Sequence, residues 1–177
     1  MAISVRLARP EDENALQRVG EEAFAAVRRL YRPGPAALEN LSKIAPVLER
    51  LVADDNGQVV GTVRYGTFND CLRVIGLGVV PQFQRRGIAR ALVEELARLA
   101  KEKGCRALAL YTITKTGNVP VFERLGFHVV SECPDEYFVS ADGEPLTEAY
   151  MERSVAQPSA AVDASGVPPR AVPLTRH

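Results

Sequence analysis

The sequence predicts a single domain of mixed α/β class, with strands and helices interleaved along the chain. The chain has 177 residues, of which 46% are hydrophobic, so it can bury one ordinary core but not two. Asn56 and Gly57 separate two apolar runs, which is the strongest short-range signal for a β-hairpin. From Ile88 onward, apolar residues recur at helical spacing. The chain therefore contains both kinds of element.

The first 35 residues predict a strand, a helix and a loop. Residues 3–8, ISVRLA, alternate between apolar and polar side chains, as a half-buried strand does. Pro10 and three acidic residues follow, which is typical of the first turn of a helix, and apolar spacing extends this helix to about residue 30. Residues 31–35, YRPGP, are expected to form a loop.

The next part predicts a second helix and three strands. Residues 35–51 are a helical run that Pro46 kinks or splits. The hairpin around Asn56 and Gly57 occupies residues 51–68, and residues 72–80, LRVIGLGVV, continue the sheet.

The last part alternates helices and strands. A helix begins at Ile88 and Gly104 can close it. After it we expect a strand at residues 106–112, a short helix at 119–125, and strands at 127–133 and 144–155. Residues 155–177 are rich in proline, serine and alanine without periodicity, so we expect a domain at residues 1–154 followed by a disordered tail.

Composition excludes several classes of function. Lysine and arginine number 22 and so do aspartate and glutamate, which gives no general attraction to nucleic acid or to a membrane. The three cysteines are far apart and have no CxxC spacing, so neither a metal site nor a disulfide framework is expected. The charged N-terminus is not a signal peptide, and the expected location is the cytoplasm.

The corner between the strand at 72–80 and the helix at Ile88 has the features of a phosphate cradle. A helix N-terminus presents unpaired backbone N–H groups to an anion. Gly87 would let the backbone approach closely, and Arg85, Arg86 and Arg90 would add positive charge. The alternative is a solvated surface turn that Gly87 eases. The segment is neither a P-loop nor a dinucleotide-binding fingerprint, because the required glycines and lysine are missing.

Two segments resemble signatures of the GNAT superfamily, the acetyl-CoA-dependent N-acetyltransferases. Residues 84–89, QRRGIA, match Q/R-x-x-G-x-G/A, the acyl-CoA pyrophosphate loop, and follow LGVVP. FERLGF, at residues 122–127, is similar to the second signature, YEKLGF. The resemblance covers about residues 3–154. It implies a mostly antiparallel sheet, flanked by helices, that splays between its fourth and fifth strands.

The resemblance also implies an acetyl-CoA site, residue by residue. The backbone of Leu77, Gly78 and Val79 would pair with the pantetheine arm, and the Val79 N–H would polarise the thioester carbonyl as in an oxyanion hole. The side chains of Leu77 and Val79 are expected in the core. The pyrophosphate would be bound mainly by backbone N–H groups of Gln84, Arg85, Arg86, Gly87, Ile88, Ala89 and Arg90.

The chain departs from the family at two positions. Counting back from Gly126, the family has a tyrosine four residues earlier and an asparagine ten earlier, where this chain has Phe122 and Thr116. Phe122 would line the coenzyme site, but it cannot protonate the departing thiolate. Asn118 either reaches the pantetheine or caps the short helix. Tyr111 is a candidate replacement acid, and ordinary packing of a strand tyrosine is the alternative.

The expected reaction is transfer of an acetyl group from acetyl-CoA to an amine of a small molecule, peptide or protein. Cys105 and Cys133 have no activating partner nearby in sequence and are expected to be small buried hydrophobes, which favours direct attack in a ternary complex. The acceptor pocket would involve residues 31–48. A non-catalytic acyl-CoA-binding regulatory module is the alternative. The expected partners are acetyl-CoA and the amine, and a homodimer stays open.

Overall fold

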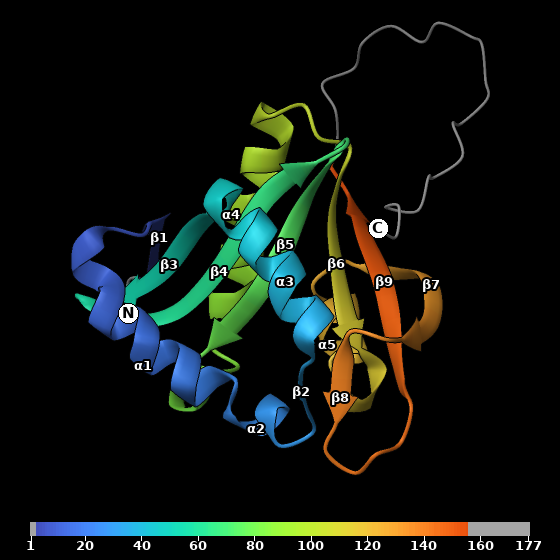
Figure 1. Ribbon diagram of the computed structural model, residues 1–177. Coiled ribbons are helices and arrows are strands. Elements are labelled where there is room, and N and C mark those ends of the chain that lie inside the picture. Colours follow the sequence, from blue (N-terminus) through green and yellow to red (C-terminus); the bar gives the residue numbers. More distant parts are fainter. Residues whose placement is uncertain (1–2, 156–177) are drawn as a thin grey trace, which may run out of the picture.

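The computed structural model describes residues 3–155, in which seven strands form one sheet in the order β1-β3-β4-β5-β6-β9-β7 (Figure 1). Neighbouring strands are antiparallel, except that β5 and β6 are parallel. The predicted mixed α/β class and mostly antiparallel sheet are therefore confirmed. The strands are β1 (Ile3–Leu7), β3 (Glu49–Asp55), β4 (Gln58–Phe68), β5 (Cys71–Val79), β6 (Ala107–Ile113), β7 (His128–Asp135) and β9 (Leu146–Ser154).

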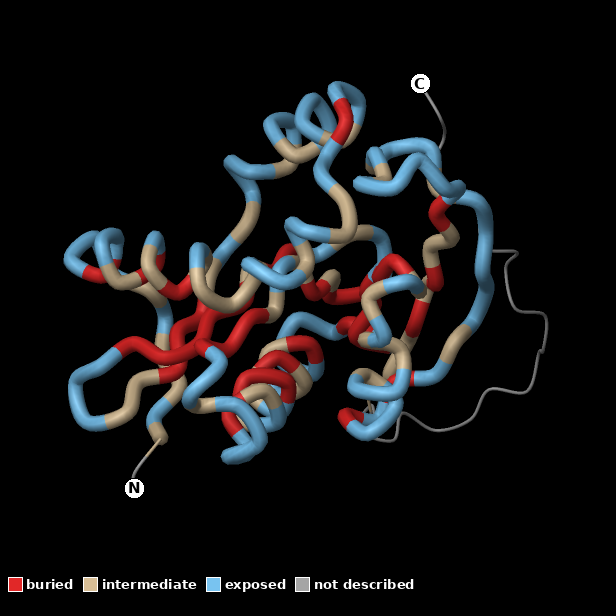
Figure 2. Tube along the Cα trace, turned by 90° about the horizontal axis from the view of Figure 1, so that it is seen from below, coloured by how far each residue is buried: buried red, intermediate tan, exposed pale blue. Residues whose placement is uncertain are grey.

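Helices cover both faces of this sheet (Figure 1). Leu92 and Leu96 of α4 pack with Val63 on one face, whereas Val19 of α1 packs with Val52 on the other. Buried positions gather along the central strands and the inner side of the helices (Figure 2). The helices are α1 (Glu13–Ala23), α2 (Ala25–Arg28), α3 (Pro35–Ile44), α4 (Ile88–Glu102) and α5 (Val119–Arg124), and the 3-10 turns are η1 (Pro10–Asp12), η2 (Ala45–Val47), η3 (Pro81–Phe83) and η4 (Thr114–Thr116).

Two expectations about the residues before the hairpin are wrong. Residues Tyr31–Pro33, expected as a loop, form β2, which pairs with β8 (Phe138–Ser140) in a second, two-stranded sheet. Their partner lies more than 100 residues away along the chain, so no local pattern could indicate the pairing. The second helical run stops early as well, because the turn at Pro46 ends it and the chain then extends into β3.

The parallel pair β5 and β6 separates after a short contact. Register partners run only from Cys71–Arg73 to Ala107–Ala109, and past this point the two strands diverge (Figure 1). The register between β4 and β5 shifts in the same region, where Gly76 has a φ of +63°. A bulge of this kind bends a strand and re-aims its neighbours. The result is the predicted opening between the fourth and fifth strands of the main sheet.

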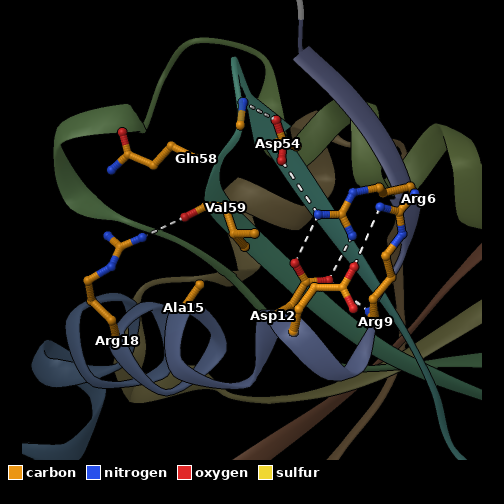
Figure 3. A pocket seen from close by; sticks show the side chains of 10 residues that line it. Arg6, Arg9, Asp12, Ala15, Arg18, Asp54, Gln58 and Val59 are labelled. Atoms are coloured by element: carbon orange, nitrogen blue, oxygen red, sulfur yellow. Dashed lines mark hydrogen bonds and ion pairs between the residues drawn. The ribbon is translucent and has the colours of Figure 1, made fainter.

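The N-terminal segment is fixed by an ion-pair network (Figure 3). The buried carboxylate of Asp12 accepts two hydrogen bonds from Arg6, at 2.7 and 2.9 Å, and one from the backbone N–H of Arg9 at 2.7 Å. Arg6 also lies 3.5 Å from Asp54 on β3. A pocket borders this network, but its buried charges are already paired with one another. We therefore assign the network a structural role.

Three further expectations concern the chain end and the cysteines. The predicted tail lies outside the described residues apart from Val155, whose N–H donates to Arg106 O at 2.9 Å. Cys105 is buried as expected, but Cys133 is exposed, because β7 is an edge strand with few covered side chains. Within residues 3–155, no helix combines the length and hydrophobicity that a membrane span requires.

Candidate active site

The backbone of β5 presents a donor to the opening. Val80 N–H donates to Val60 O of β4 at 2.9 Å. Because successive N–H groups of a strand point to opposite edges, the Val79 N–H points away from β4, toward the side that β6 has left. The side chains of Leu77 and Val79 pack in or against the main core, as predicted. The opening is thus lined by backbone whose side chains are engaged elsewhere.

The end of α1 lies directly against this part of β5. A Cβ atom added to Gly78 would come within 2.7 Å of Phe24 Cζ and 3.0 Å of Ala23 Cβ. A side chain at position 78 would therefore force Phe24 to shift, and glycine lets the helix end approach the strand closely. Phe24 interrupts the first helical run at this point and separates α1 from α2.

The backbone of the predicted phosphate corner adopts an uncommon, left-handed conformation at two residues. Arg85 and Gly87 both adopt positive φ, at +61° and +82°. The side-chain amide of Gln84 donates to Val79 O at 3.0 Å and so ties the corner to the end of β5. A Cβ on Gly87 would meet no other atom within 4 Å, so the space beside the corner is open. A non-glycine residue in the left-handed region is uncommon, and Arg85 marks the corner as a functional candidate.

The helix that follows leaves free donors at this corner. Its first intrahelical hydrogen bond is donated by Ala91 N–H to Gly87 O at 2.9 Å. The N–H groups of Ile88, Ala89 and Arg90 consequently have no acceptor inside α4. The Ile88 side chain is buried, and one of its methyl carbons lies 3.1 Å from the Cβ position of Gly61, which seats the helix start on the sheet. These donors and the helix dipole suit an anion.

The three arginines of the corner are placed differently. Arg86 lies with its Cζ 5.0 Å from the centre of the Phe83 ring. Arg90 donates to Arg124 O at 3.0 Å and so links α4 to the end of α5. Arg85 carries the positive φ and is exposed.

The second signature lies on the α4 side of the sheet. Asn118 occupies the N-cap position of α5, but its side chain makes no capping hydrogen bond. The Phe122 ring packs edge-on against Phe127 with centroids 5.9 Å apart, and it contacts the main core. Tyr111 is adjacent in β6 to Leu110, which points into that core, so its side chain points to the opposite face. The structure thus separates Tyr111 from Phe122.

Tyr111 belongs instead to an aromatic and cationic group on the α1–α3 face. Its ring lies 4.8 Å from that of Tyr150 on β9. The Arg73 guanidinium lies 4.8 Å from the Tyr111 ring centre and 5.2 Å from that of Phe68. Burial raises the pKa of Tyr111, and Arg73 opposes that rise.

An acidic pair lies on the same face, and the sequence did not reveal it. Glu148 on β9 pairs with Ile113, the last residue of β6. Burial, followed by the charge of Asp135, raises the pKa of Glu148 to about 7, while Arg73 acts in the opposite direction. The pKa of Tyr31 of β2 is raised too, first by burial and then by the charges of Asp135 and Glu148, so this tyrosine lies near the acidic pair. Two acids on separate strands carry no spacing signal, so only the fold brings them together.

Asp135 is held by the backbone and keeps one oxygen available. Its Oδ1 accepts hydrogen bonds from the N–H groups of Tyr137 at 3.1 Å and Phe138 at 2.7 Å. Its Oδ2 is buried and has no partner among residues 3–155, and the same holds for Arg73 Nε. Within that part of the chain, no group of three or more histidine, cysteine, aspartate or glutamate side chains is arranged to hold a metal ion.

Comparisons with known proteins agree with this architecture. A sequence model described as the Acetyltransferase (GNAT) family matches residues 16–127. An uncharacterized N-acetyltransferase of Chlorobaculum tepidum is 31% identical over 135 residues, which span 76% of this chain and 79% of the relative.

Solved structures show the same fold. The ribosomal-protein-S18-alanine N-acetyltransferase of Escherichia coli superimposes with a TM-score of 0.70 at 18% identity, covering 92% of this chain and 99% of that one. YncA of Salmonella typhimurium, a putative acetyltransferase solved with acetyl-CoA, gives 0.67 at 19% identity, covering 93% and 100%. Together with the family match and the opening between β5 and β6, these similarities establish that the chain belongs to the GNAT acetyltransferase family.

Proposed function

We propose that this protein transfers the acetyl group of acetyl-CoA to a primary amine by direct attack within a ternary complex. The observation that carries the proposal is the opening between β5 and β6, with the Val79 N–H facing it and the Gly87 corner at its end. A thioester carbonyl beside that N–H would gain a fixed hydrogen bond as negative charge grows on its oxygen.

The coenzyme would be held along β5 and around the corner. Leu77, Gly78 and Val79 supply backbone groups for the pantetheine arm. The N–H groups of Ile88, Ala89 and Arg90, which have no acceptor in α4, would take the pyrophosphate, with Gln84 fixing the corner and Arg85 and Arg86 adding charge. The side-chain amide of Asn118 makes no capping hydrogen bond to α5 and would therefore be able to contact the pantetheine. Phe122 would line the coenzyme site only by apolar packing, with its ring held against that of Phe127.

The leaving group requires no tyrosine in this proposal. Phe122 has no proton to give, and Tyr111 lies on the other face of the sheet. A thiol has a pKa of about 8.5, so CoA can leave as the thiolate and take its proton from water or from the attacking amine. We therefore propose that no side chain acts as general acid.

The acceptor would enter from the α1–α3 face, where β2, α3 and β8 form the wall. Tyr31 and the exposed Leu38 belong to the segment that the sequence indicated for this pocket. This location supports a small amine or a chain terminus as acceptor. The proposal further places the protein in the cytoplasm and allows a homodimer.

The test is thiol release from acetyl-CoA in the presence of a panel of amines, including amino acids, polyamines and peptide N-termini. We expect release that depends on one class of amine, with a product whose mass increases by one acetyl group. The rival is a non-catalytic acyl-CoA-binding regulatory module, suggested by the missing tyrosine. Tight binding of acetyl-CoA by calorimetry without amine-dependent release from any member of the panel would favour that rival.

A further inference from the structure

We propose that Glu148 is the general base that deprotonates the acceptor amine, and that Asp135 and Arg73, from strands on either side of β9, are positioning residues. This inference rests on the proposed acetyl transfer. It assigns a role to a residue that lies outside both signature segments, residues 84–89 and 122–127. It concerns the last strand of the sheet, outside the residues that the sequence motifs indicate.

The position of Glu148 in the sheet places it next to the opening. Its register partner on β6 is Ile113, which is four residues beyond Ala109, where pairing between β5 and β6 stops. Because paired residues project to the same face and alternate residues share a face, Glu148 lies on the side of Tyr111 and Arg73. This is the α1–α3 face, from which we expect the amine to enter.

The charged surroundings of Glu148 are mixed. Asp135 of β7 raises its pKa and Arg73 of β5 lowers it. Burial raises the pKa values of Tyr31 of β2 and Tyr111 of β6, and both groups lie close enough for the charge of Glu148 to raise these values further.

Cys133 of β7 lies directly across from Glu148. Burial is the largest contribution, and together with Asp135 and Arg73 it raises the pKa of Glu148 to about 7. A carboxylate with this affinity can take up and release a proton near neutral pH, which is the property that a general base needs.

Two buried atoms of the group point to a bound molecule. Asp135 Oδ2 can only accept and Arg73 Nε can only donate when the groups are charged, and both lack partners among the described residues. A buried polar atom without a partner is costly. An ammonium group between Asp135 and Glu148 would donate a hydrogen bond to Asp135 Oδ2 and a proton to Glu148, whereas Arg73 Nε is a donor and would need an acceptor elsewhere in the bound substrates.

The step balances as follows. The Glu148 carboxylate takes one proton from the bound ammonium, and the nitrogen lone pair then attacks the thioester carbon. The C–N bond forms, the C–S bond breaks, and CoA leaves as the thiolate. The amide nitrogen loses its second proton to the thiolate, and Glu148 returns its proton to solvent. One proton is released for each amide formed.

The main test is the pH profile of kcat/KM for the amine at saturating acetyl-CoA, with Glu148→Gln, because this parameter reports ionisable groups of the enzyme before the amine binds. We expect the wild-type rate to rise through a pKa of about 7. The variant should lose about 100-fold in kcat/KM, because general bases contribute about that much. Its profile should also lack this rise with pH, which we call the acidic limb. The matched control is Glu132→Gln on β7, which pairs with Ala149 and therefore lies on the opposite face; its profile should not change.

Two further variants predict shifts of opposite sign. Asp135→Asn removes a negative neighbour, so the limb should move to lower pH. Arg73→Met removes a positive neighbour, so the limb should move to higher pH, with shifts of about half a unit or more in each case. A purely structural role would lower both rates without moving the limb in opposite directions.

Two measurements separate this proposal from the proposed function. Carbon NMR of labelled glutamate should show one carboxyl that titrates near pH 7 without substrates and is absent from Glu148→Gln. Calorimetry should give the same acetyl-CoA affinity for all four variants. If wild type acetylates an amine but Glu148→Gln keeps the limb and stays within about threefold in kcat/KM, Glu148 is not the base. If wild type acetylates nothing, the proposed function fails first.

Discussion

Exchanging Gly87 for aspartate tests the coenzyme site most directly, and asparagine is the matched control. Gly87 is the N-cap of α4 with a φ of +82°, and a Cβ there would meet no atom within 4 Å. Asparagine and aspartate tolerate left-handed backbone better than other side chains, and both are favourable N-cap residues. The strain is about 1 kcal/mol, which lowers Tm by about 2–4 °C in a chain of this size. Both variants should therefore fold.

The difference between the two variants is one negative charge at the proposed pyrophosphate site. A carboxylate about 5 Å from two phosphate charges, at an effective dielectric constant of about 40, repels them by about 3 kcal/mol. This corresponds to about a 150-fold increase in Kd beyond that of the asparagine variant. Asparagine should cost far less, because the backbone N–H groups of α4 remain in place.

The assay is calorimetric titration of acetyl-CoA into wild type and both variants at low salt, with Tm measured in parallel. The repulsion should weaken as salt is added, because the corner is exposed. If the folded aspartate variant binds acetyl-CoA as tightly as the asparagine variant, the coenzyme does not approach this corner and the reasoning above is refuted.

Three other predictions address the remaining parts of the molecule. Tyr111→Phe should change kcat by less than about threefold and leave the alkaline side of the pH profile unaltered; a loss of about 100-fold with intact acetyl-CoA binding would make Tyr111 the general acid. Gly34→Ala places a Cβ 2.8 Å from Tyr137 O, so it should raise KM for the amine while the Kd of acetyl-CoA stays constant. An equal rise in this KM and in the Kd of acetyl-CoA would contradict a role on the acceptor side. Asp12→Asn should destabilise the fold by about 2 kcal/mol in urea unfolding, since Arg6 loses the nearer of its two carboxylate partners. Hydrogen bonds from Arg6 hold the pKa of Asp12 at about 2, so wild-type stability from this group is present above about pH 4 and is lost as pH falls toward 2, whereas the variant should lack this dependence.

Features that depend on neighbouring residues could be predicted from the sequence. Asn56 and Gly57 predicted the hairpin of β3 and β4, and the apolar spacing from Ile88 predicted α4. The corner was also visible, because Gly87 and the start of a helix lie next to each other in the chain. In each case the preference is local: a turn, a helical period or a left-handed residue is favoured by a few consecutive side chains.

The surfaces that residues far apart in the chain form together became apparent from the fold. Tyr31 to Pro33 became a strand because residues 138–140 supply its partner, and Cys133 proved exposed because β7 has no strand beyond it. Glu148 is set apart from other surface acids by Asp135 and Arg73, which come from two other strands of the sheet. Burial and charge fields depend on distances in space, and a single sequence does not contain those distances. The coenzyme corner could therefore be predicted from consecutive residues, whereas the acceptor side required the fold.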